Sequence, residues 1–173
     1  MKNKRTKLNL TRLILTMALM LITLVTFAQR GGANFSGSWG INYGNSELGE
    51  AGRTLAASSI EVKQDRNSLL VQRTTPMPDG SSYNSSEKYT MDGQNNINTG
   101  MMNMQVQSTV TRAGNDRTLT IQSTMVYERD FDSIEIKTAE VWTLSADGNT
   151  LTIDSVASTT QGEWKRKFVY DKK

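Results

Sequence analysis

The side chains best placed for chemistry in this sequence are two glutamates and an arginine, Glu87, Glu140 and Arg166. Each lies in a segment of alternating residues, on the side of the predicted strand that also carries aromatic side chains, so each is expected to face the interior. Because a buried charge is costly without a partner, these groups either form a satisfied internal ion pair or serve as polar anchors at the floor of a ligand cavity. A register that turns Glu140 towards water is the remaining alternative.

Glu87 and Glu140 have the residue type of a glycosidase pair, but nothing in the local sequence sets the separation that this reaction needs. The sequence contains no histidine and no cysteine. Serine–histidine and cysteine–histidine nucleophiles, zinc sites built from these residues and c-type haem attachment are therefore excluded. We predict no catalytic residue and no enzyme, with an unrecognised hydrolase as the alternative.

Two further clusters have residue types that can bind metals. Met101, Met102 and Met104 carry thioethers, which select Cu(I), although methionine also fills irregular cores and lines cavities. The acidic turn over 128–132 could attract calcium, but it lacks the glycine and the distal glutamate of a known calcium loop. We therefore expect no bound metal and no other cofactor.

Residues 1–28 have the organisation of a secretory signal peptide. A basic head ends at Arg12, an uncharged run of 16 residues follows, and Thr26 and Ala28 place small residues before a cut at Gln29. The run is shorter than the roughly 20 residues of a spanning helix, so cleavage is expected, and an uncleaved anchor is the alternative. The protein is then exported to the periplasm or the extracellular medium, with no membrane span after cleavage.

Removal of the leader changes the charge of the protein. The full chain has 20 basic and 17 acidic residues, and five of the basic residues but none of the acidic ones lie in 1–28. The mature chain therefore has 15 basic and 17 acidic residues, a net charge of −2. The basic excess belongs to the leader, so no nucleic-acid partner is predicted.

The rest of the chain alternates in period two, which predicts an all-β domain over 35–173 after a flexible lead at 29–34. Turns such as Asp79-Gly80 and Asp147-Gly148 have hairpin chemistry. Short strands joined by tight turns favour an up-and-down antiparallel barrel of about 8–9 strands, with a two-sheet β-sandwich as the alternative. The predicted strands lie at 35–43, 59–64, 68–75, 83–91, 102–112, 117–127, 133–144, 149–156 and 163–171.

Residues 44–57 break this rhythm with three glycines. The part from Ser46 onwards is predicted to contain a turn of helix with Ser46 as its cap. Because long connections carry function more often than tight turns, we expect this segment to act as a flap over the mouth of the barrel.

The opening residues Phe35-Ser-Gly-Ser-Trp39 resemble the Gly-x-Trp motif that begins the first strand of lipocalin-type barrels. More closely, nearly all of 29–173 resembles small, uncharacterised secreted lipocalin-like proteins of Bacteroidetes-type bacteria. The resemblance implies a lipocalin- or calycin-like barrel in which Gly37 and Trp39 are structural and Trp39 packs beneath Arg166, a contact of about 1 kcal/mol. The second lipocalin motif, Thr-Asp-Tyr, is absent. The other motifs that resemble those of the secreted Bacteroidetes-type proteins are Tyr89-Thr-Met-Asp-Gly93, Trp142-Thr-Leu-Ser-Ala-Asp-Gly148 and Phe168-Val-Tyr-Asp-Lys172.

We therefore expect an exported, monomeric, non-catalytic binding protein for a small, partly apolar ligand held in the barrel interior. A cavity of several hundred Å³, about 300–1,000 Å³, is predicted. The alternative is an envelope structural or interaction module with a filled barrel, which uses its polar outer face. The site residues are expected to be Trp142, Trp164, Tyr83, Tyr89, Met102 and Met104 as the lining, with Glu140 and Arg166 as polar contacts.

Two short patterns, 132–134 and 154–156, resemble the Asp-Ser/Thr-aliphatic pattern of O-glycosylation in Bacteroidetes-type bacteria. The resemblance makes Ser133 and Ser155 candidate sites of sugar attachment.

Overall fold

The computed structural model describes residues 32–49, 53, 55–114, 117–129 and 132–173. The predicted leader at 1–28 and the first residues of the flexible lead lie outside this part. Residues Ala33–Lys173 form one compact unit. Within the described ranges, no helix is long and apolar enough to cross a membrane.

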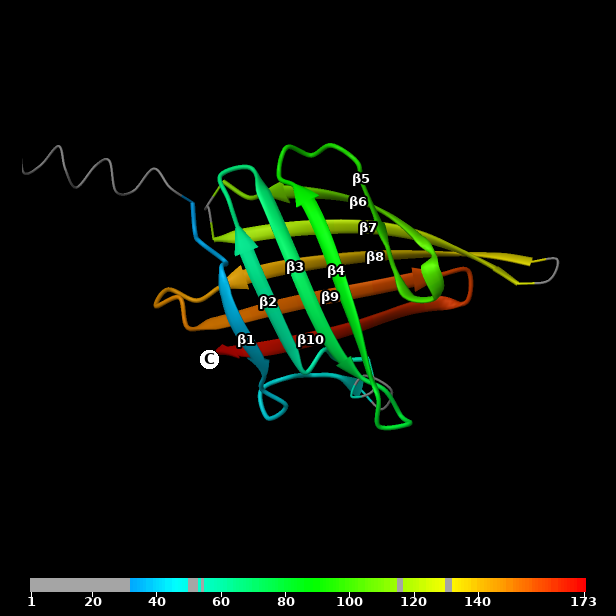
Figure 1. Ribbon diagram of the computed structural model, residues 1–173, viewed down its shortest axis with the longest axis horizontal. Helices are drawn as coiled ribbons and strands as arrows, with labels where there is room; N and C mark the ends of the chain where they lie inside the picture. The colour runs from blue at the N-terminus through cyan, green and yellow to red at the C-terminus, as the bar shows by residue number, and fades with distance from the viewer. Residues whose placement is uncertain (1–31, 50–52, 54, 115–116, 130–131) are drawn as a thin grey trace, which may run out of the picture. The chain divides into compact units, whose positions relative to one another are not determined.

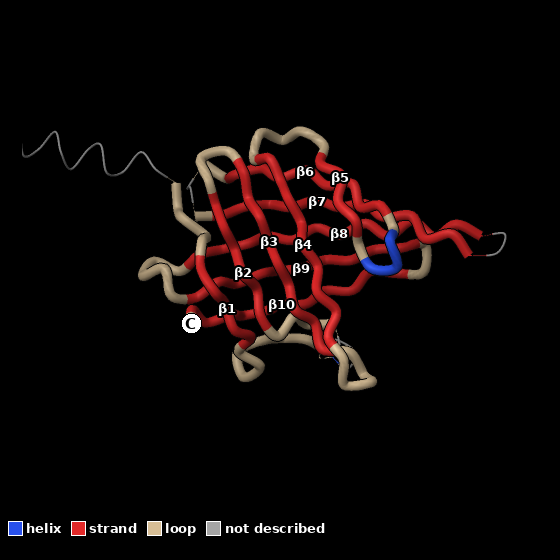
Figure 2. The backbone as a smooth tube through the Cα atoms, in the orientation of Figure 1, coloured by secondary structure: helices blue, strands red, loops and turns tan. Residues whose placement is uncertain are grey.

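The described residues of this unit form ten strands and one short 3₁₀ turn, which is blue in Figure 2. The elements are β1 (Gly37–Ile41), β2 (Ser59–Gln64), β3 (Ser68–Pro76), β4 (Ser82–Thr90), β5 (Asn96–Thr99), η1 (Met101–Asn103), β6 (Gln105–Arg112), β7 (Thr118–Arg129), β8 (Asp132–Leu144), β9 (Thr150–Thr159) and β10 (Gly162–Lys172).

All the strand pairs are antiparallel, and they form one continuous sheet in the order β4-β3-β2-β1-β10-β9-β8-β7-β6-β5. The sheet curves so that β1–β4 cross in front of β5–β10 (Figure 1), and its two edges, β4 and β5, approach each other. The predicted up-and-down barrel is confirmed, and the two-sheet sandwich is wrong because the sheet is continuous. The barrel has one strand more than expected, β5, which the period-two pattern did not indicate.

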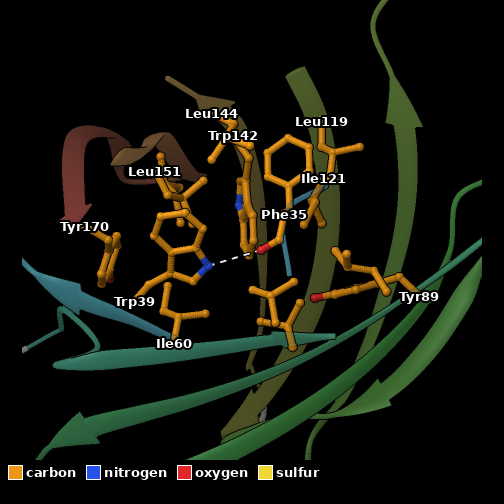
Figure 3. Close-up of a cluster of buried hydrophobic side chains, with 14 of the residues drawn as sticks. Phe35, Trp39, Ile60, Tyr89, Leu119, Ile121, Trp142, Leu144, Leu151 and Tyr170 are labelled. Atoms are coloured by element: carbon orange, nitrogen blue, oxygen red, sulfur yellow. Dashed lines mark hydrogen bonds between the residues drawn. The ribbon is translucent and has the colours of Figure 1, made fainter. Parts of the chain in front are cut away.

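The hydrophobic core fills one end of the barrel. Trp39 on β1, Ile60 on β2 and Trp142 on β8 have no exposed surface, and they pack together in the cluster of Figure 3. The Trp39 indole N–H donates to the carbonyl oxygen of Phe35 at 3.1 Å, so the polar atom of this buried ring is satisfied. Burial decreases along the strands away from this end, as on β3, where Leu69 and Val71 are buried and the following inward residues are only half-buried.

Side chains, rather than a backbone ladder, join the two edges of the sheet. The amide of Asn98 on β5 accepts from the Lys88 N–H at 2.8 Å and donates to the Lys88 carbonyl oxygen at 3.1 Å. Asn96 accepts from the Thr90 N–H at 2.8 Å, also across the gap. An asparagine side chain has both a donor and an acceptor, so it can replace one backbone partner of an edge strand. We call Asn96 and Asn98 the asparagine seam.

Replacing Asn98 with alanine is expected to open this seam locally. Loss of one hydrogen bond of about 1 kcal/mol corresponds to roughly fivefold faster amide exchange at Lys88. Amide hydrogen exchange followed by NMR measures this rate. Asn84→Ala is the control, because Asn84 lies on the same strand as Lys88 but accepts from the Thr74 hydroxyl, at 2.9 Å, instead of crossing the gap to β5. Equal exchange rates at Lys88 in the two variants would contradict the role of the seam.

Two expectations about local structure are wrong. The strand predicted from residue 102 begins at Gln105, because Met102 and Asn103 have positive φ angles of 57° and 59° and belong to η1. Ser46 does not cap a helix. Its hydroxyl accepts from the Val169 N–H at 2.9 Å and donates to the Asn42 carbonyl oxygen at 2.7 Å, so it attaches this segment to β10. Residues 50–52 and 54 of the predicted flap lie outside the described residues.

Candidate functional site

Three charged side chains meet inside the barrel. Arg73 on β3 binds Glu140 on β8 through two hydrogen bonds, in which Nη1 donates to Oε1 at 3.2 Å and Nη2 donates to Oε2 at 2.8 Å. The third member is Glu87 on β4, whose Oε2 lies 3.3 Å from Arg73 Nε. The three side chains are only 16–21% exposed. We call Arg73, Glu87 and Glu140 the charged cluster.

The strand period positions the charged cluster directly beside the core. On each of three strands, a charged residue lies two positions from a buried core residue, on the same face of the strand. The pairs are Val71 and Arg73 on β3, Tyr89 and Glu87 on β4, and Trp142 and Glu140 on β8. The cluster therefore separates the packed end of the barrel from its other end.

Neutral side chains complete the surroundings of the two carboxylates. The Tyr89 hydroxyl donates to Glu87 Oε2 at 2.9 Å, and the Ser85 hydroxyl donates to Glu87 Oε1 at 3.1 Å. The Trp142 indole N–H donates to Glu140 Oε2 at 2.8 Å, and the guanidinium of Arg73 lies 5.3 Å from the centre of a Trp142 ring. The hydrogen bonds that Glu140 accepts from Arg73 and Trp142 favour its ionised form.

The electrostatics keep the cluster charged. Burial would lower the pKa of Arg73, but the attraction of Glu140 and Glu87 outweighs it and raises this pKa well above its ordinary value. Burial would likewise raise the pKa of Glu140, but Arg73 and the hydrogen bond from Trp142 lower it on balance. Burial and the neighbouring Glu87 raise the pKa of Tyr89, so its hydroxyl stays protonated and remains a donor. By formal charge, the cluster has one cation and two carboxylates.

Two hollows adjoin the charged cluster, an inner cavity of about 190 Å³ and an outer pocket of about 420 Å³. Arg73, Glu87 and Gly100 line both, so the two spaces are neighbours. The inner cavity is also lined by Tyr89, Asn98, Thr99, Val106, Ile121, Ser123, Thr138 and Glu140. The outer pocket is also lined by Leu55, Thr75, Met77, Pro78, Tyr83, Ser85 and Met101.

Three of the residues predicted for the site line these hollows. Glu140 and Tyr89 line the inner cavity, and Tyr83 lines the outer pocket. Trp142 lies in the core, where its indole supports Glu140. The inward orientation of Glu87 and Glu140 is confirmed, and the register that turns Glu140 towards water is wrong.

The other predicted lining residues lie away from both hollows. Trp164, on the inward side of β10, is 43% exposed, and Met102 on η1 is 73% exposed. Met104 is half-buried in the connection between η1 and β6, so the two methionines do not share a strand face. The neighbouring Met101, which the sequence suggested only as a thioether ligand, lines the outer pocket.

The predicted stacking of Arg166 on Trp39 is wrong. Lys172 takes that place, with its ammonium 5.4 Å from the centre of a Trp39 ring. Arg166 lies half-buried on β10 and is not among the residues that line the two hollows. The structural role of Gly37 is consistent with its φ of 154° and with Lys172 Cε lying 3.0 Å from the position of an added Cβ.

Arg73 is the residue that sequence reasoning missed. The strand 68–75 was predicted, and its alternation puts Arg73 on the same face as Leu69 and Val71. An arginine on an apolar strand face was the available signal, and it indicates a buried partner.

The predicted sugar-attachment sites differ in accessibility. Ser155 is only 8% exposed and lies between Glu140 and Arg166 in the strand register, so the folded barrel gives little access to it. Ser133 is exposed on β8, and its modification stays a prediction. Among the described residues, no group of three or more acidic side chains could hold a metal ion.

The described residues form a continuous, nearly closed sheet of ten antiparallel strands, an up-and-down β-barrel. Among solved structures, the chain is similar to the zebrafish ileal bile acid-binding protein complexed with cholic acid, at 14% identity and a TM-score of 0.52, over 80% of this chain and 98% of that chain. At this identity the likeness shows the fold alone. No protein-family model and no curated protein matches the sequence.

Proposed function

We propose that this protein is an exported, non-catalytic binding protein for a small, partly apolar ligand held in the barrel interior. The observation that carries the proposal is the charged cluster at the junction of an inner cavity and an outer pocket. Ligand sites are mostly apolar concavities of about 300–1,000 Å³ with a few placed polar groups, and the two neighbouring hollows together fit this description.

The two hollows suit different parts of one ligand. The outer pocket has apolar walls from Leu55, Met77 and Pro78, with the ring of Tyr83 beside them. The inner cavity offers polar groups from Glu140, Ser123 and Asn98. A molecule with an apolar body and one polar end would place its body in the outer pocket and its polar end against the charged cluster.

The electrostatics support binding rather than hydrolysis. A glycosidase of the two-carboxylate kind needs one carboxylic acid with a raised pKa to protonate the leaving group. The pKa of Glu140 moves in the opposite direction, and both carboxylates contact the same guanidinium. The zebrafish protein with this fold is described as a bile acid-binding protein, which agrees with a binding role here.

Export is part of the proposal and rests on the sequence. The basic head, the short apolar run and the small residues at 26 and 28 have the order of a secretory leader. A ligand of the exported protein would then be met in the periplasm or outside the cell.

Replacing Thr138 with phenylalanine tests the proposal, because Thr138 lines the inner cavity and a ring would occupy that space. Mass spectrometry of small molecules released from natively purified protein is expected to find a ligand in the wild type and at least about tenfold less of it in the variant. Thr143→Phe is the matched control, since Thr143 is exposed on the opposite face of the same strand. No released molecule from any of the three proteins would favour the alternative role on the polar outer face.

A further inference from the structure

We propose that the charged cluster selects a ligand whose polar end donates hydrogen bonds and carries no negative charge, such as an alcohol or an amine, over a carboxylate. This inference rests on the proposed binding function and adds the chemical class of the ligand. It follows from the charge of the lining residues and from the hydrogen-bonding capacity that the cluster leaves unused.

The described residues that line the two hollows have a formal net charge of −1. Arg73, Glu87 and Glu140 are the charged residues among those that line either space, and the remaining lining residues are neutral. Arg73 is the basic group that lowers the pKa of Glu140, and Arg166 on β10 takes no part in this. A ligand carboxylate would add a second uncompensated negative charge in a partly buried space, where charges are screened less than in water.

The hydrogen bonds of the two carboxylates leave acceptor positions for a ligand. Glu140 Oε1 accepts one hydrogen bond, from Arg73, and Glu87 Oε1 accepts one, from Ser85. Each carboxylate oxygen has two lone pairs, so each of these atoms can accept one hydrogen bond more. An alcohol or an amine can donate to these positions, whereas a carboxylate has no proton to donate.

One donor of the cluster is also without an acceptor. The Arg73 Nε–H is the buried side-chain polar atom that has no hydrogen-bond partner among the described residues, although Glu87 Oε2 lies only 3.3 Å away. Because this atom has almost no exposed surface, a ligand would meet the carboxylates of the cluster rather than this N–H. A ligand group that donates hydrogen bonds therefore suits the cluster, whereas a group that only accepts them does not.

Three probes with the same decyl chain separate these possibilities, namely decanol, decylamine and decanoate. Each is titrated at pH 7 against the purified protein loaded with the neutral dye Nile red, and displacement of the dye gives the affinity. Decanol and decylamine are expected to bind at least about tenfold more tightly than decanoate. Decanoate binding as tightly as the other two would overturn the inference and leave the binding function in place. Failure of the dye and of every probe to bind would overturn the binding function itself, and the inference with it.

A charge-removing variant tests the cause of the preference. Glu87→Gln keeps an acceptor oxygen for one of the two hydroxyls, of Tyr89 and Ser85, that bond Glu87, and it brings the formal charge of the described lining residues to zero. The preference for decylamine over decanoate is expected to fall by about tenfold in this variant. Glu135→Gln is the matched control, because Glu135 lies on the outer face of β8, is 51% exposed and pairs with Lys137. An unchanged preference in folded Glu87→Gln would overturn the electrostatic explanation. If this variant does not fold, the ranking of the three probes on the wild-type protein decides the inference.

Discussion

Replacing Arg73 with methionine is expected to lower the free energy of unfolding by about 3 kcal/mol at pH 7, because the change leaves two buried carboxylates without a cation. This value is at the lower end of the range for a broken buried ion pair, because the three side chains are 16–21% exposed to solvent, which screens their charges. The variant also loses the contact of the guanidinium with the Trp142 ring. Urea unfolding of the wild type and the variant measures the difference.

The loss is expected to depend on pH. In the wild type the pKa of Glu140 is lowered, so the stability from its charged form is present above the unfolded pKa of about 4.3 and is lost as the pH falls through the folded pKa. Without Arg73, burial raises the pKa of Glu140 in the folded protein. The variant therefore loses stability as the pH rises above the pKa that Glu140 has in the unfolded chain. The difference between wild type and variant is therefore largest at pH 7 and shrinks towards pH 3.

Two further variants make this prediction specific. Arg166→Met removes an inward arginine that does not touch the charged cluster, and it is expected to cost less than about 1 kcal/mol. Adding Glu140→Gln to Arg73→Met removes one of the unpaired charges and should recover part of the stability. Equal losses in Arg73→Met and Arg166→Met would show that the cluster does not support the fold.

Replacing Trp39 with alanine is expected to destabilise the barrel by about 3–5 kcal/mol, the range for a large side chain removed from a packed core. Trp39 is fully buried, its indole bonds Phe35, and Lys172 covers its ring from the last strand. The variant loses these contacts together and leaves a cavity at the packed end of the barrel. Thermal and urea unfolding followed by far-ultraviolet circular dichroism measure the effect.

Trp164→Ala is the control for this second prediction. It removes the same side chain from β10, where the ring is 43% exposed and does not belong to the core cluster, and a loss below about 1 kcal/mol is expected. A loss in Trp164→Ala equal to that in Trp39→Ala would contradict the position of the core at one end of the barrel.

The local pattern of the sequence was sufficient to predict which side chains face inward. Glu87 and Glu140 each lie two positions from an aromatic residue, and so on the same face of the strand. The face on which a residue lies depends only on the extended backbone of its own strand. The barrel itself followed from the number of strands and the tight turns between them. These features require no knowledge of which distant strands meet.

The partner of Glu140 could not be predicted in this way. Arg73 is 67 positions away in the sequence, on a strand that reaches Glu140 only across the interior of the curved sheet. The period-two pattern does not indicate where a residue lies along the barrel axis. It therefore predicted the face on which Trp164 lies, but not that the Trp164 side chain is exposed to solvent. The interior contacts are set by closure of the sheet, which is a property of all ten strands together.

Two local features also misled the sequence reasoning. The spacing of Met102 and Met104 fits a strand, but η1 follows Gly100 and interrupts it with positive φ angles. The strand β5 has the sequence Asn-Ile-Asn-Thr, and asparagine has low β-propensity, so the pattern gave little sign of it. Its asparagines are favoured here because their side-chain amides bond the neighbouring edge strand.

The pairing of β1 with β10 closes the sheet between two strands that lie far apart in the sequence. β1 pairs with β2 along one edge and with β10 along the other. In the pairing with β10, Trp39 lies opposite Lys172 and Ile41 opposite Tyr170. Contacts between segments so distant in the sequence slow folding, since the chain must lose the entropy of a long loop before they form. Until then the free edges of β1 and β10 remain templates for pairing with other chains. The barrel is therefore most exposed to aggregation in the interval before its last strand docks.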